Sequence, residues 1–192
     1  MNYGETLAFW YLRLNGFFPL MDFVFHRGED LRHTSDCDLL ALRFPHVFEE
    51  VGGQKEDWDW ARFRQWGIDL ARPVVVIAQV KTGAHSDAGA FDAAKVQRAL
   101  CRVGLWEIEE VMASVKVLRN AALFADAKAQ VVKVLVAPEP RAQEDRYRIL
   151  SLCEVLGFLR QRFGRYQGSK EADRLFFKEE LIQFLASSES KL

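Results

Sequence analysis

The chain has 192 residues, of which 49% are hydrophobic and 12% aromatic. This is enough apolar material for a packed core and excludes a disordered chain. Lysine and arginine number 26 against 27 aspartates and glutamates, a net charge of −1, so nucleic-acid binding would need a local basic patch. The length fits one domain spanning residues 1–192.

The cysteines and the hydropathy pattern predict a cytoplasmic protein. Cys37, Cys101 and Cys153 lie far apart and form no CxxC pair, which argues against a disulfide framework or a structural zinc site. Residues 1–20 carry charges inside an amphipathic pattern, which is not typical of a signal peptide. No uncharged apolar run is long enough to span a bilayer, so no membrane contact is expected.

The first elements in chain order are a helix and two strands. Residues 4–15 place apolar side chains at helical spacing, and Asn15 followed by glycine supplies a helix stop. Residues 17–27 and 37–44 are typical of strands and are close enough in sequence to pair as a hairpin. Pro19 favours either an edge position or a strand entrance for the first of these strands.

An irregular segment follows, which we interpret as an insertion at about residues 45–72. It holds a cluster of three tryptophans and two arginines, and a short helix around 57–66 is expected. This cluster could stack bases or cover a site, or it could be an amphipathic helix packed on the sheet. The third strand, 73–81, is the most apolar and is therefore expected at the centre of the sheet.

The second half of the chain alternates between helices and strands. It comprises a helix from Ala90 to a stop at Gly104, a helix at 106–125, a strand at 129–140, a short strand running into a helix at 147–166, and a C-terminal helix at about 170–188. Strands that first form a meander and are later joined through helices predict a mixed sheet with helices on both faces.

Polar residues interrupt the apolar pattern where two predicted strands begin or end. The third strand finishes in Gln79, Val80 and Lys81, and a period of two places Gln79 and Lys81 on one face. Asp38 opens the preceding strand, and Glu5 lies on the first helix. Oxygen ligands suit Mg²⁺, and a lysine can contact water and phosphate together, which is the chemistry of the family that this order of residues resembles.

The same residues resemble the PD-(D/E)xK phosphodiesterase superfamily, over roughly residues 1–165. The opening GETLAFWYL…NGFF is similar to the first helix of its resolvase-like and Mrr-type members, and DCDLLAL resembles a strand of that family. Gln79 stands where most members have an acid, and the Mrr-type branch also carries glutamine there. The resemblance implies a restriction-endonuclease-like fold, with a mixed central sheet flanked by helices on both faces.

The resemblance also implies an activity, which is Mg²⁺- or Mn²⁺-dependent phosphodiester hydrolysis acting on DNA. The implied catalytic residues are Asp38, Gln79, Lys81 and Glu5, and the implied metal ligands are Asp38, Gln79 and the carbonyl of Val80. The alternative is a catalytically inactive module that binds nucleic acid or a protein partner, because a glutamine brings neither charge nor basicity. A further alternative is an unrelated α/β domain in which the motif is accidental.

Each site residue also has a plainer interpretation. Glu5 could serve the helix dipole in the first turn, Asp38 could cap a strand entrance, and Lys81 could be solvated. The expected phosphate-binding patch is Arg160, Arg162, Arg165 and Lys170, for which the alternative is a charged helix end. Nucleases of this kind often pair to cut both strands, so a homodimer is compatible with the sequence.

Overall fold

The structure is a computed structural model that describes residues 2–24, 36–50, 52–83, 90–139, 141, 145–166 and 180–188. Its elements in chain order are α1 (Tyr3–Leu14), β1 (Phe18–Val24), β2 (Asp36–Arg43), the 3₁₀ helix η1 (Lys55–Asp57), α2 (Trp60–Gln65), β3 (Val74–Val80), α3 (Ala93–Val103), α4 (Ile108–Leu118), β4 (Leu123–Ala125), β5 (Gln130–Ala137), β6 (Arg148–Ser151), α5 (Leu152–Arg165) and α7 (Glu180–Ser188).

Within the described residues, six strands form one mixed sheet in the order β1-β2-β3-β5-β4, and β6 also pairs with β5. The β1–β2 and β2–β3 pairs are antiparallel, whereas β3–β5 and β5–β6 are parallel. β1 lies at an edge and contains Pro19, as predicted. β3 is buried along its whole length and lies inside the sheet, as its apolar sequence predicted.

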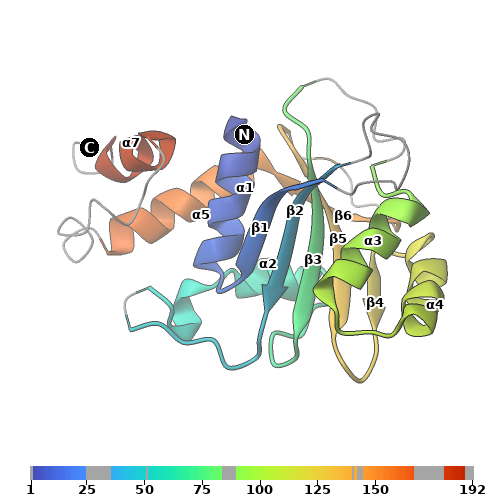
Figure 1. The fold of residues 1–192 in the computed structure, drawn as a ribbon. Helices are drawn as coiled ribbons and strands as arrows, with labels where there is room; N and C mark the ends of the chain where they lie inside the picture. Colours follow the sequence, from blue (N-terminus) through green and yellow to red (C-terminus); the bar gives the residue numbers. More distant parts are fainter. Residues whose placement is uncertain are drawn as a thin grey trace.

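Helices cover both faces of the sheet, and each face has its own apolar cluster (Figure 1). Side chains from α1, α2, α5 and α7 form the first cluster, and side chains from α3 and α4 form the second. Alternation along β3 sends Val76 and Ala78 to the α1 face and Val75 and Ile77 to the α3 face. The predicted mixed α/β architecture with helices on both faces is therefore present.

α1 ends where the sequence predicted it would. Asn15 is the C-cap, and Gly16 follows with φ +80°, a conformation that glycine adopts without strain. A Cβ at Gly16 would lie 2.8 Å from Cγ1 of Val47, so a side chain there would also clash. This turn sends the chain directly into the edge strand β1.

One predicted helix is shorter than expected. The apolar spacing predicted a helix over 106–125, but α4 ends at Leu118 and the chain turns and forms β4. β4 pairs antiparallel with the beginning of β5, and this hairpin pairing overrides the helical pattern of the sequence. At the C-terminus, the described helix covers Glu180–Ser188, and residues 170–179 of the predicted helix lie outside the described residues.

Within the described residues, no helix combines the length and the apolar character needed to cross a bilayer.

Candidate functional site

The site forms at the carboxyl end of β3, where Asp38 forms a hydrogen bond with Val80, the last residue of the strand. The last β2–β3 pair is Leu39 with Ala78, and Asp38 lies one residue beyond it. Its Oδ2 accepts the backbone N–H of Val80 at 2.6 Å, so a carboxylate replaces a backbone partner in the ladder. The side chain of Asp38 is only half-buried, which leaves part of it facing the end of the sheet.

The pKa of Asp38 reports which charges surround it. Burial raises the pKa of this carboxyl above its ordinary value of 3.8, outweighing the Val80 N–H and the ammonium of Lys81, which lower it. Glu5 raises the pKa further, and Lys95 lowers it. The sequence analysis selected Glu5, Asp38 and Lys81 from separate parts of the chain. The structure brings Glu5 and Lys81 close enough to Asp38 to change its pKa.

Lys81 continues the strand geometry beyond β3. Its backbone N–H donates to the carbonyl of Val136 at 2.9 Å, so the pairing with β5 extends by one residue. Strand alternation then keeps Lys81 on the face of Gln79, towards α3. Val80 faces α1 instead, since its side chain belongs to the α1 cluster.

Sequence reasoning missed Lys95. It lies in the first turn of α3, whose N-cap is Asp92, and it is the second lysine that acts on Asp38. The available signal was weak: Lys95 opens the helix that follows β3, and such a crossover helix begins near the carboxyl end of the strand it leaves. Nothing in the local sequence distinguishes it from a solvated lysine.

Glu5 has a structural task that engages both oxygens of its carboxylate. Oε2 accepts the backbone N–H of Asn2 at 2.9 Å, and Oε1 accepts Nδ2 of Asn2 at 2.6 Å. Asn2 in turn accepts the backbone N–H of Glu5 at 3.0 Å, which completes a capping box at the start of α1. Glu5 therefore contributes its charge to the site while its oxygens stabilise the helix end.

α1 approaches the end of β3 closely because Gly4 has no side chain. A Cβ on Gly4 would lie 2.5 Å from Cγ2 of Thr82 and 3.0 Å from Cγ1 of Val80. Tyr3 adds a hydrogen bond at 3.4 Å from its hydroxyl to the carbonyl of Thr82. This contact fixes the start of α1, and with it Glu5, beside the site.

Gln79 is buried near the end of β3. The residue is 3% exposed, and alternation along β3 places it on the face covered by α3. Its amide oxygen is thus shielded from solvent. Within the described residues, no group of three or more histidine, cysteine or acidic side chains is arranged to hold a metal ion.

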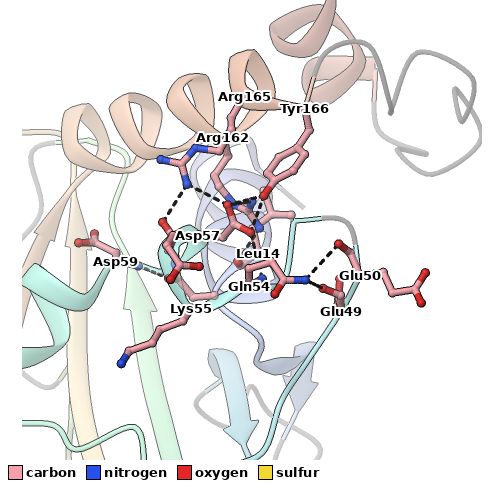
Figure 2. A network of polar contacts seen from close by, with 12 residues as sticks. Leu14, Glu49, Glu50, Gln54, Lys55, Asp57, Asp59, Arg162, Arg165 and Tyr166 are labelled. Atoms are coloured by element: carbon pink, nitrogen blue, oxygen red, sulfur yellow. Dashed lines mark hydrogen bonds and ion pairs between the residues drawn. The ribbon is translucent and has the colours of Figure 1, made fainter.

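The predicted phosphate patch is not a continuous surface. Arg162 is 2% exposed, and its Nη1 lies 3.0 Å from Oδ1 of Asp57; Arg165 also donates to Oδ1 of Asp57, at 2.9 Å (Figure 2). The surface role predicted for Arg162 is therefore wrong, because a buried carboxylate neutralises it. Arg160 is exposed, and Lys170 lies outside the described residues.

Asp57 connects the insertion to the C-terminal end of α5. Besides the two arginines, it accepts the Tyr166 hydroxyl at 2.7 Å and the Gln54 N–H at 3.0 Å. Burial would raise the pKa of Asp57, but these donors and charges outweigh it and leave the pKa lowered. A cavity of about 220 Å³ beside this network is lined by Trp58, Trp60 and Phe158 among other residues.

The segment at about residues 45–72, interpreted from the sequence as an insertion, packs against the α1 face of the sheet. Phe63 of α2 and its C-cap residue Trp66 are buried in the α1 cluster, and Trp58 and Trp60 pack against it. Of the two interpretations of the tryptophan cluster, an amphipathic helix docked on the sheet describes α2. The Asp57 network contacts Leu14 at the C-terminal end of α1 through Arg162, whereas Glu5 and the Asp38 site lie at the N-terminal end.

Comparison of the chain with known proteins finds no matching family model, no matching curated protein and no matching solved structure.

Proposed function

We propose that the protein is a metal-dependent phosphodiesterase that acts on DNA, built on a restriction-endonuclease-like fold. The observation that carries the proposal is the Asp38 carboxylate, held by the N–H of Val80 at the end of the central strand, with Lys81 and Lys95 acting on it. The mixed sheet with helices on both faces and the position of α1 beside this strand end support the resemblance to the PD-(D/E)xK superfamily.

Asp38 and the carbonyl of Val80 would hold Mg²⁺ or Mn²⁺. Oδ2 of Asp38 is engaged with Val80, which leaves Oδ1 for an ion. Mg²⁺ usually keeps several waters and is bound through one or two carboxylates together with substrate phosphates, so this small donor set fits such an ion. The ion would activate water and offset charge on the transferring phosphate. Gln79 is buried beside this position, and its amide brings no charge to an ion.

The two lysines would bind the phosphate. A lysine ammonium is a compact charge on a flexible stem, and Lys81 and Lys95 approach Asp38 from a strand end and from a helix. Because the net charge of the chain is −1, attraction of a polyanion depends on such local cations. Lys81 would orient the scissile phosphate and the attacking water, and Lys95 would hold a neighbouring phosphate oxygen.

The second candidate is a non-catalytic module that binds nucleic acid. The observation that favours it is the state of the other two predicted site residues: both oxygens of Glu5 are engaged in the capping box, and Gln79 is buried. Asp38 would then be the only predicted site carboxylate with a free oxygen among the described residues. The two candidates differ in whether a divalent ion binds and whether phosphodiester bonds are cut.

Cleavage of supercoiled plasmid and of end-labelled oligonucleotides with Mg²⁺ or Mn²⁺ tests the first candidate. Asp38→Asn retains an acceptor for the Val80 N–H but removes the charge, and it should reduce cleavage by about 100-fold or more. Lys81→Met should also reduce it strongly. The matched control is Lys116→Met, an exposed lysine of α4, which should leave the rate unchanged.

Two results would decide against hydrolysis. Equal cleavage by the wild type and Asp38→Asn would show that the activity does not come from this site. Absence of cleavage, together with calorimetry that finds no Mg²⁺ or Mn²⁺ binding at millimolar concentration with DNA present, would favour the non-catalytic module.

A further inference from the structure

The edge strand β1 leaves apolar side chains uncovered on the α3 face of the sheet. Phe18 and Leu20 are 57% and 52% exposed. Met21 packs against the α1 cluster, so alternation places Phe18 and Leu20 on the opposite face. Their cross-strand partners Leu42 and Leu40 belong to or pack against the α3 cluster, which shows that helix coverage on this face ends at β2.

Phe44 extends this uncovered surface beyond the end of β2. Its ring centroid lies 6.4 Å from that of Phe18 in an edge-on arrangement, and the residue is 49% exposed. We call Phe18, Leu20 and Phe44 the aromatic shelf. Exposed apolar patches on an otherwise well-packed protein indicate a surface that binds something.

Three cationic side chains lie on α3, the helix that covers the same face of the sheet. Lys95, Arg98 and Arg102 are spaced three and four residues apart on α3 and therefore share one side of the helix. α3 packs against Leu40 of β2 in the α3 cluster, and Lys95 acts on Asp38 and Cys37 of β2, so this side of α3 faces β2. We call these three residues the basic row.

The basic row runs from the site along the shelf. α3 belongs to the crossover between the parallel strands β3 and β5, and such a helix runs antiparallel to its strands (Figure 1). Lys95 therefore lies at the site end and Arg102 towards the opposite end. There β1 begins with Phe18 and β2 ends, next to Phe44.

We propose that the aromatic shelf and the basic row bind single-stranded nucleic acid and guide it to Asp38 and Lys81. Unpaired bases would stack on Phe18 and Phe44, and phosphates would follow the basic row, which is the usual combination in single-strand binding surfaces. In a duplex the bases are stacked on one another, so they are not available to stack on the aromatic shelf. Delivery of the strand to Asp38 and Lys81 rests on the proposed function, but binding of the strand to the aromatic shelf and the basic row does not require hydrolysis.

A second copy of the chain fits this surface less well. A two-fold pairing through β1 would place the basic rows of both copies beside the same interface, and like charges brought together destabilise it. A polyanion with exposed bases complements both the cations and the aromatic rings. The charge of the row therefore favours nucleic acid over self-association.

Fluorescence anisotropy in EDTA with a labelled oligonucleotide of about 12 nucleotides tests the proposal. EDTA separates this binding from metal-dependent cleavage, so failure of the hydrolase proposal leaves the test intact. Phe18→Ser and Arg102→Glu should each weaken binding about fivefold or more. Arg102→Glu should also reduce the slope of log affinity against log salt by about 0.7 for each phosphate that the protein no longer neutralises.

The matched controls lie on the outer side of α4, where Met112 is 44% exposed and Lys116 is exposed. Met112→Ser and Lys116→Glu repeat the two chemical changes and should leave affinity within about twofold. Circular dichroism and thermal unfolding should show that all four variants fold like the wild type.

Any of four outcomes would overturn the proposal. These are no binding of the single strand by the wild type in low salt, equal effects of the shelf and control variants, equal or tighter binding of a duplex of the same sequence, and a wild-type dimer that Phe18→Ser dissociates. The last outcome would identify the shelf as an interface between copies of the chain, and light scattering on the same samples detects it.

Discussion

Replacing Asp57 by alanine should destabilise the protein by about 3–5 kcal/mol, the range for removing one partner of a buried ion pair. Asp57 is 3% exposed and Arg162 is 2% exposed. Without the carboxylate, the buried guanidinium of Arg162 keeps a hydrogen bond of 3.5 Å to the carbonyl of Leu14 but loses the counter-charge. Arg165 can turn into solvent, because its side chain is 40% exposed.

The structure predicts an asymmetry between the two partners. Arg162→Met leaves Asp57 with Arg165, the Tyr166 hydroxyl and the Gln54 N–H. The carboxylate then stays paired, and the cost should be only about 1–3 kcal/mol. The double variant leaves no unpaired buried charge, so it should cost no more than Asp57→Ala alone.

Equilibrium unfolding in urea and thermal unfolding measure these differences. For a chain of this length, 3–5 kcal/mol corresponds to a fall in Tm of about 6–20 °C. The control is Glu56→Ala. The side chain of Glu56 is exposed, and Arg165 donates to the backbone carbonyl of Glu56, which the substitution retains. This substitution should change stability by less than about 0.5 kcal/mol.

Two results would refute this reasoning. A cost below about 1 kcal/mol for Asp57→Ala would show that Arg162 does not depend on this carboxylate. Strict additivity of the two single substitutions in the double variant would show that the charges are not coupled. In either case this segment would be held by its other contacts, which include the apolar packing of Phe63 and Trp66 and the hydrogen bonds between Asp59 and α1.

Three further predictions concern titrating groups. Burial on folding raises the pKa of Asp38 above 3.8, so the folded state binds this proton more tightly than the unfolded state does. The free energy of unfolding should therefore fall as the pH rises from 3.8 through the raised pKa. Asp38→Asn should abolish this fall. Folding lowers the pKa of Lys133 from 10.5 to about 8, so stability should rise between those pH values in the wild type relative to Lys133→Met. Cys37 is buried with a pKa of about 12, so a thiol reagent should label Cys101 and Cys153 rapidly and Cys37 only in denaturant.

Elements with strong local signals could be predicted from the sequence. The apolar run 73–81 predicted a central strand, and β3 is fully buried inside the sheet. Gly104 stops α3 with φ +72°, as a glycine after a helix indicates. β4 could not be predicted, because its three residues form a strand only by pairing with β5.

At the candidate site, too, the local pattern could be predicted from the sequence, whereas the tertiary contacts could not. The period of two placed Gln79 and Lys81 on one face, but the cover provided by α3, which buries Gln79, depends on tertiary packing. The buried state of Arg162 depends on Asp57, which lies more than 100 residues earlier in the chain. Lys95 reaches Asp38 only because α3 returns over the sheet. Local patterns contain none of these long-range contacts.

The charges around Asp38 also constrain the order of binding at the proposed site. Among the described residues, Lys81, Lys95 and Glu5 act on Asp38, so these four side chains together carry no net charge. A site with no net negative charge has weak affinity for a free divalent cation, whereas a bound phosphate supplies both charge and oxygen ligands. DNA should therefore increase the affinity for Mg²⁺, and by linkage Mg²⁺ should increase the affinity for DNA by the same factor. Calorimetry with a phosphorothioate oligonucleotide that resists cleavage measures this coupling. An equal Mg²⁺ affinity with and without the oligonucleotide would contradict it, because the protein alone would then supply the whole ligand set.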